Sequence, residues 1–386
     1  MTARGFDTTE YQTRTRQIQA RMARADIATL LLTTEADLRY VSGFLTRFWE
    51  SPTRPWFLVL PAKGAPIAVI PSIGAALMAT TWVTDIRTWR APDYDDDGVT
   101  LLAETLAVVT PKGGRIALPD GGGTHLRMPL ADWQQVQSLV DDAVFCGDDG
   151  VMAQQRQIKT QAEITKIKAA CAIADRAFAR VPEIARAALP LSEVFRRFQM
   201  LCLEEGADWV PYLAGGAGQG GYADVISPAT DQPLMAGDVL MLDTGLIRDG
   251  YFCDFDRNFS VGPPTSATRD AHARLIAATQ AAFDAAKPGI TAAALFDMMD
   301  QITTGGRGGS SAGRLGHGLG LQLTEPPSLI AADQTELQPG MVLTLEPGID
   351  TGAGRIMVHE ENIVITDTGA EWLSEPASAD IKVLDI

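Results

Sequence analysis

The sequence is poor in histidine and in basic residues, and it has no long apolar run. Only 4 histidines occur among 386 residues, and 32 lysines and arginines face 48 aspartates and glutamates, which gives a net charge of −16. Such acidity would repel nucleic acid and anionic lipid, so neither is expected as a partner. No apolar run reaches the roughly 18 residues that a membrane-spanning helix needs.

Cysteine is scarce as well, and the N-terminal segment lacks the features of a signal peptide. The four cysteines show no spacing typical of a disulfide framework (Cys146, Cys171, Cys202, Cys253). The segment from Tyr11 to Ala25 carries four arginines among polar residues and predicts a surface helix instead of an apolar leader. The expected environment is therefore a reducing cytoplasm.

The length allows two domains, and the pattern of apolar runs changes near residue 152. Between Ile27 and Gly147, short apolar runs alternate with helical stretches, which predicts an α/β N-terminal domain over residues 1–152. A capping box at Thr160 and Glu163 then opens a long helix. Further helices bracket apolar runs that predict antiparallel strands, so residues 153–386 are expected to form an α+β domain.

Five side chains suited to metal binding lie in the C-terminal half, each in or beside an apolar run (Asp243, Asp254, His317, Glu346, Glu360). Four carboxylates gathered in one place would repel one another unless cations neutralised them. Alone, each residue has an ordinary interpretation, as a strand-end acid or as a histidine in a glycine-rich loop. Together, the oxygen-rich set indicates one or two divalent first-row metals.

The first two of these acids are predicted to lie on one hairpin. Asp249-Gly250 separates two apolar runs, which is the strongest short-range signal for a two-residue hairpin turn. With that loop, Asp243 pairs with Asp256 and lies diagonal to Asp254 on the same face. A three-residue loop would place Asp254 on the opposite face, so the prediction depends on register.

Five motifs in this order resemble those of the pita-bread metallopeptidases, the family of methionine aminopeptidase, aminopeptidase P, prolidase and creatinase. They are Leu242–Gly245, Gly250–Asp254, Gly316–Gly320, Leu345–Gly348 and Glu360–Thr366. A weaker similarity to the N-terminal domain of creatinase and prolidase extends the resemblance over nearly the whole chain. The implied fold is an α/β domain followed by an α+β pita-bread (creatinase/aminopeptidase-like) catalytic domain.

The resemblance also implies roles for the five residues. Asp243 would bind one divalent ion and His317 another, while Asp254, Glu346 and Glu360 would share both. Manganese, cobalt, zinc and iron all suit this ligand set. Glu346 is in addition the candidate general base. Relatives commonly form homodimers, so a homodimer is expected here.

The chain departs from the peptidase pattern at two positions where relatives carry further histidines. Thr324 stands at one of them, beside Glu325 of the following Glu-Pro pair, and Ile226 aligns with the other. We therefore predict that Thr324 takes part in catalysis and that Glu325 contacts the substrate. Val358 stands where many relatives have an arginine. Losing both histidines should weaken peptide hydrolysis, because histidine transfers protons most readily near neutral pH.

Two further segments are candidates for substrate contacts. The glycine-rich stretch 215–222 is interpreted either as a mobile pocket loop presenting Tyr222 or as a plain connecting loop. Its Gly-x-Gly-x-x-Gly match is not followed by a helix pattern, so dinucleotide binding is rejected. In the N-terminal domain, Arg47 and Trp49 lie in a segment, 47–56, that either reaches the substrate or is only a packed loop.

The leading hypothesis is a dinuclear metal-dependent hydrolase of an amide or other C–N bond, with the architecture of an Xaa-Pro peptidase. Its substrate would be a short peptide or a small molecule. One alternative is a metal-dependent lyase or hydrolase of a small non-peptide metabolite, since the dimethylsulfoniopropionate lyases share this fold. Another is a non-catalytic binding protein, although such relatives have typically lost ligands that this chain retains.

Overall fold

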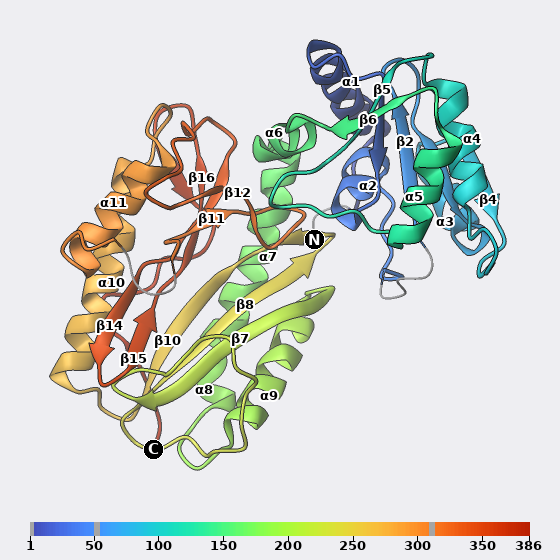
Figure 1. Ribbon diagram of the computed structural model, residues 1–386. Coiled ribbons are helices and arrows are strands. Elements are labelled where there is room, and N and C mark those ends of the chain that lie inside the picture. Colours follow the sequence, from blue (N-terminus) through green and yellow to red (C-terminus); the bar gives the residue numbers. More distant parts are fainter. Residues whose placement is uncertain (1–3, 50–54, 309–312) are drawn as a thin grey trace. The chain divides into compact units, whose positions relative to one another are not determined.

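The computed structural model describes residues 4–49, 55–308 and 313–386. The chain forms two compact units, of which the first ends at Arg156 and the second begins at Gln157 (Figure 1). The predicted boundary after residue 152 falls inside helix α6, Val151–Gln157.

The first unit is an α/β domain built on a six-stranded mixed sheet with the order β4-β3-β2-β1-β5-β6. β1 pairs antiparallel with β2 and parallel with β5. The strands are β1 (Thr29–Leu32), β2 (Phe57–Pro61), β3 (Ile67–Pro71), β4 (Asp85–Trp89), β5 (Arg115–Leu118) and β6 (Val144–Gly147). The helices are α1 (Thr8–Arg24), α2 (Glu35–Ser42), α3 (Ala75–Met78), α4 (Val99–Val109) and α5 (Leu130–Leu139), with a 3₁₀ turn at Ser72–Gly74.

The core of this unit lies between the sheet and helices α4 and α5, where Leu31, Phe57, Leu106 and Val136 are fully buried. Strands with apolar side chains on both faces are typical of sheets covered by helices. The expected surface helix is α1, which buries one face through residues including Ile18 and Met22.

The second unit consists of two halves, each combining helices with a sheet (Figure 1). In the first half, the sheet order is β18-β10-β8-β7, with β9 paired to β8. Its elements are α7 (Gln161–Ala179), α8 (Val181–Ile184), α9 (Leu191–Glu204), β7 (Trp209–Gln219), β8 (Asp238–Arg248), β9 (Tyr251–Phe252), β10 (Phe255–Val261) and β18 (Lys382–Leu384). The capping box predicted for α7 is present, because Thr160 and Glu163 each accept a backbone N–H of the other.

The second half contains a sheet with the order β12-β11-β13-β16-β17 and a separate β14–β15 hairpin. Its elements are α10 (Ser266–Ala285), α11 (Ala292–Thr303), β11 (His317–Gly318), β12 (Glu325–Ser328), β13 (Val342–Leu345), β14 (Gly348–Gly352), β15 (Arg355–Val358), β16 (Glu361–Ile365) and β17 (Ala370–Trp372). Helices α10 and α11 pack on this sheet through a core that includes Leu295, Leu343 and Ile363.

The glycine-rich stretch is largely a strand, so its interpretation as a loop is wrong. Residues up to Gln219 belong to β7, which pairs with β8 along its length. A Cβ atom on Gly215 would lie 2.1 Å from the carbonyl oxygen of Met241, so only glycine allows β8 to approach this closely. Glycines that indicate a loop by composition serve here as contact points between strands.

The predicted hairpin register is confirmed. β8 and β10 pair with Asp243 opposite Asp256, and β8 pairs with β9 so that only Asp249 and Gly250 form the turn. Both turn residues have positive φ, 49° and 82°, as a type I′ turn requires.

All four cysteines are free thiols. Within the described ranges, no helix combines the length and the apolar character needed to cross a bilayer.

Candidate metal centre

The five predicted ligands all lie in the second unit, in or beside strands from both of its halves. Asp243 is in β8, and Asp254 lies between β9 and β10. His317 begins β11, Glu346 directly follows β13, and Glu360 directly precedes β16. Each half of the unit therefore contributes to the same site.

Three of the five side chains lie within metal-binding reach of one another. Asp254, His317 and Glu360 each offer a ligand atom, and these atoms all lie within 4.8 Å of one another. His317 Nε2 is 3.4 Å from Asp254 Oδ2. The carboxylates of Asp243 and Glu346 interact electrostatically with this cluster, because the charge of Asp254 contributes to the raised pKa of both.

The carboxylates are buried without enough hydrogen-bond donors. Among the described residues, one oxygen each of Asp243, Asp254 and Glu360 has no hydrogen-bond partner. Burial raises the pKa of all three well above its usual value, and neighbouring carboxylates contribute. Buried carboxylates with free oxygens are costly unless a cation compensates them, so this donor set fits hard divalent metal ions.

Glu346 differs from the other three acids because it stays partly exposed. Burial and the charge of Asp254 raise its pKa to about 7, while His317 and Arg314 oppose that rise. A carboxylate with a pKa near neutrality can both take up and release a proton at physiological pH.

The local structure presents His317 in the form that binds metals. Nδ1 lies 2.8 Å from the carbonyl oxygen of Gly318, to which it donates, so Nε2 keeps its lone pair on the side of Asp254. Burial and the charge of Arg314 lower the pKa of His317, which favours the neutral ring. Gly316 precedes it at φ 137°, where a Cβ would lie 2.3 Å from the carbonyl oxygen of Thr344.

Two residues that hold the ligands in place were not predicted from the sequence. The Tyr212 hydroxyl on β7 donates to Asp243 Oδ2 at 3.0 Å. Asn362 on β16 holds the backbone of Asp254 from both sides, because its Oδ1 accepts from the Asp254 N–H and its Nδ2 donates to the Asp254 carbonyl. Tyr212 was missed because β7 was interpreted as a loop. The Asn362 contact joins segments 108 residues apart.

Thr324 is held by an arginine that the sequence did not single out. Arg314 Nη2 donates to Thr324 Oγ1 at 3.2 Å. The charge of Arg314 also acts on the ligands, because it opposes the burial-driven rise in the pKa of Asp254. The sequence signal that could have identified Arg314 was its position three residues before His317. Ile226, aligned with the second missing histidine, is 84% exposed.

Two of the residues predicted to contact the substrate, Tyr222 and Glu325, are buried and have partners within the fold. Tyr222 is 1% exposed, and its hydroxyl accepts from the N–H of Val358. It belongs to the apolar core and offers no surface to a substrate. Glu325 is also buried, where it pairs with Lys159 at 3.0 Å and accepts the N–H groups of Leu321 and Gln322. Both side chains thus have partners within the fold, and their predicted substrate contacts stay predictions.

Arg47 and Trp49 belong to the first unit, and their predicted substrate contacts stay predictions. The ring centroids of Trp49 and Trp56 are 6.1 Å apart. The guanidinium of Arg127 lies over the Trp49 ring, with its Cζ 5.1 Å from the ring centroid. These contacts agree with the packed-loop interpretation of the segment. Residues 50–54 of the same segment lie outside the described residues.

A two-halved α+β unit with a buried carboxylate–histidine cluster, preceded by an α/β unit, defines a metallohydrolase of the pita-bread class. The Metallopeptidase family M24 matches residues 165–367, and the Creatinase/Prolidase N-terminal domain matches residues 14–158. The chain belongs to metallopeptidase family M24, as its resemblance to the pita-bread metallopeptidases predicted.

The similarity to individual relatives covers almost the whole chain. A probable dipeptidase PepE of Mycobacterium tuberculosis is 32% identical over 375 residues, which is 96% of this chain and 96% of that protein. An Xaa-Pro dipeptidase of Lactobacillus delbrueckii subsp. lactis is 28% identical over 91% of this chain and 95% of its own length. The crystal structure of dipeptidase PepE from Mycobacterium ulcerans superposes with a TM-score of 0.84 at 28% identity, covering 99% and 100% of the two chains.

Proposed function

We propose that this chain is a dipeptidase that uses two divalent metal ions to hydrolyse the amide bond of short peptides, with Xaa-Pro dipeptides as the first substrates to test. The observation that supports it most is the convergence of Asp254, His317 and Glu360 within 4.8 Å, with carboxylate oxygens that lack partners among the described residues. Similarity to dipeptidases over nearly the whole chain supports peptides as the substrate class.

Asp243, Asp254, His317, Glu346 and Glu360 would hold the two ions, with manganese, cobalt, zinc and iron as candidates. Divalent ions held there would polarise the scissile carbonyl and lower the pKa of a water molecule. Glu346 would take the proton from that water, and its partial exposure and its pKa of about 7 support this role. Arg314 offers a positive charge beside Thr324 that can orient an anionic group of the substrate.

The test is hydrolysis by the full chain after metal removal and after reloading with each candidate ion. We expect cleavage of dipeptides such as Ala-Pro only in reloaded protein, together with close to two equivalents of bound metal by elemental analysis. Dipeptides without proline, such as Ala-Ala, define the specificity. Loaded protein that cleaves no member of a broad dipeptide panel would contradict the proposal.

Thr324 provides a second test, because it stands where peptidases of this family carry a histidine. The substitution Thr324→His is expected to raise kcat/KM on an Xaa-Pro dipeptide by about tenfold or more, since proton transfer by a side chain contributes roughly 10²–10⁴ in rate when fully used. Steady-state kinetics between pH 6 and 9 would measure the effect.

Thr324→Asn is the matched control, because asparagine is polar but does not titrate. It should not reproduce the gain. Native activity that is already high and is unchanged by Thr324→His would show that the chain does not need this histidine. Weak native peptidase activity with rapid turnover of a small non-peptide amide would instead favour the alternative substrate class.

The homodimer and the contribution of Arg47 and Trp49 to the pocket belong to the same proposal. If a partner's N-terminal unit closes the pocket, Trp49→Ala should raise KM for a dipeptide more than it lowers kcat. Light scattering of the same sample would give the oligomeric state.

A further inference from the structure

Besides the four acids among the proposed ligands, the same region holds a further buried acid, Asp256, which the sequence motifs do not include. Asp256 is 1% exposed and lies on β10 directly opposite Asp243 on β8. Residues directly opposite each other on neighbouring antiparallel strands have their side chains on the same face. Asp256 therefore points to the same side of the hairpin as the proposed metal ligand Asp243.

The Asp256 carboxylate has unused acceptor capacity. Neither oxygen has a hydrogen-bond partner of good geometry among the described residues, although the ring of His359 lies 3.4 Å from Oδ1. Its charge also reaches the centre, because it contributes to the raised pKa of Asp243, Asp254, Glu346 and Glu360. A fully buried carboxylate with so few close donors is costly unless positive charge lies nearby.

The ring of His359 lies between two of these buried acids. Its Nδ1 is 3.4 Å from Asp256 Oδ1, and its Nε2 is 3.2 Å from Glu361 Oε1. The imidazole thus links Asp256 to Glu361, next to the proposed ligand Glu360.

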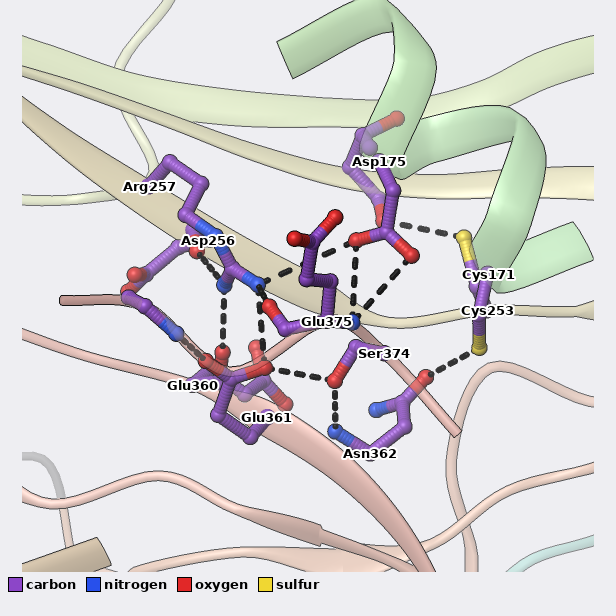
Figure 2. Close-up of polar contacts among 12 residues, drawn as sticks. Cys171, Asp175, Cys253, Asp256, Arg257, Glu360, Glu361, Asn362, Ser374 and Glu375 are labelled. Atoms are coloured by element: carbon purple, nitrogen blue, oxygen red, sulfur yellow. Dashed lines mark hydrogen bonds and ion pairs between the residues drawn. The ribbon is translucent and has the colours of Figure 1, made fainter. Parts of the chain in front are cut away.

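Glu361 is in turn fixed by a dense set of donors, as Figure 2 shows. Arg257 Nη2 donates to it at 3.0 Å, and the Ser374 hydroxyl and the Ala377 N–H donate as well. Arg257 also donates to the carbonyl oxygen of Glu360 at 3.3 Å. A continuous series of polar contacts therefore runs from Arg257 through Glu361 and His359 to Asp256.

We propose that Asp256, held by His359, is an additional acid of the metal centre that strengthens binding of divalent cations. The inference rests on the proposed function, because it takes the five ligands to hold metal. Asp256 acts through its fixed negative charge and its free oxygens, and His359 is a positioning residue that keeps the carboxylate directed at the centre. Outer partners of this kind typically change metal affinity by about 10–100-fold when they are removed.

The test is the affinity of metal-stripped full-length protein for Mn²⁺ and Zn²⁺, measured by calorimetry or by competition with a chromogenic chelator. Asp256→Asn should raise the dissociation constant by about 10–100-fold while the protein stays folded. In metal-free protein, the same substitution should leave the melting temperature unchanged or raise it, since it removes a repelling charge. A purely structural role would lower that temperature.

Asp175→Asn is the matched control. Asp175 lies on the other side of Arg257, 3.9 Å from its guanidinium, and accepts the N–H of Glu375 (Figure 2). We expect this variant to bind both cations as the natural protein does. His359→Gln tests the positioning role, and its effect on affinity should shrink when Asp256 is already asparagine.

Unchanged affinity in Asp256→Asn would overturn the inference and leave the proposed function intact. Equal weakening in Asp256→Asn and Asp175→Asn would also overturn it, because the effect would not be specific to the metal side. Natural protein that binds cations but cleaves no peptide would contradict only the proposed function. Natural protein that binds neither cation would contradict both.

Discussion

Glu346→Gln is expected to lower kcat on a cleavable dipeptide by about 10²–10⁴-fold. Glutamine keeps the shape of the side chain but can neither accept the proton nor provide a full negative charge. Glu346 is the partly exposed acid of the proposed set, and burial and neighbouring charges raise its pKa to about 7. Steady-state kinetics at saturating metal, with bound metal measured in the same sample, would give the size of the effect.

Glu371→Gln is the control for this experiment. Glu371 is an exposed glutamate on β17, so the same chemical change there should leave kcat unchanged. If Glu346→Gln retained full metal content and most of its activity, Glu346 would not be the general base, and another group would have to take the proton.

Divalent metal is expected to stabilise the protein strongly at pH 8 and weakly at pH 5. Burial raises the pKa of Asp243, Asp254, Glu346 and Glu360 in the folded, metal-free protein. Acids with a raised folded pKa favour the folded state below their unfolded pKa and lose that contribution as pH rises through the folded value. Because folding raises the pKa of Glu346 from 4.5 to about 7, the contribution of Glu346 to the stability of the metal-free protein is lost between about pH 4.5 and 7.

At pH 5 a metal ion must displace protons from these acids, whereas at pH 8 it meets ionised carboxylates. A ligand at one hundred times its dissociation constant stabilises a protein by about 2.7 kcal/mol, and this gain should be reached at a much lower metal concentration at pH 8. The measurement is the rise in melting temperature on adding Mn²⁺ or Zn²⁺ at the two pH values. Because the same protein is compared with and without metal, the pH-dependent contribution of groups outside the centre cancels. His272 is one such group, since burial lowers its pKa to about 4.

Asp254→Asn should abolish most of the metal-dependent rise, because Asp254 lies in the cluster within 4.8 Å. An equal rise at pH 5 and pH 8 would show that the acids do not titrate in the expected range. No rise at either pH, at metal concentrations in the millimolar range, would contradict the metal centre itself.

Much of the architecture follows from local sequence patterns. The capping box at Thr160 and Glu163 starts α7 as predicted, because its two hydrogen bonds are made within four residues. The Asp249-Gly250 turn sets the register of its hairpin for a similar reason, since the positive φ angles favour these two residue types. Through that register, the sequence also places Asp243, Asp254 and Asp256 on one face.

Contacts between distant segments were not predictable in this way. The strand β7 has the composition of a loop, and only its close approach to β8 explains Gly215. From the sequence, Tyr222 was a candidate pocket residue, and only the structure shows that its hydroxyl contacts Val358, 136 residues away. Glu325 is similar, because its partner Lys159 lies 166 residues earlier in the chain.

By itself, the sequence determined the family, the five candidate ligands and the two-residue turn, because each depends on residue types at short, fixed spacings. Only the tertiary structure decided which polar groups surround those ligands. Tyr212 and Asn362 contact the ligands Asp243 and Asp254, and Arg314 contacts Thr324, from separate strands and loops. Their roles depend on burial and charge in three dimensions, which no local spacing encodes.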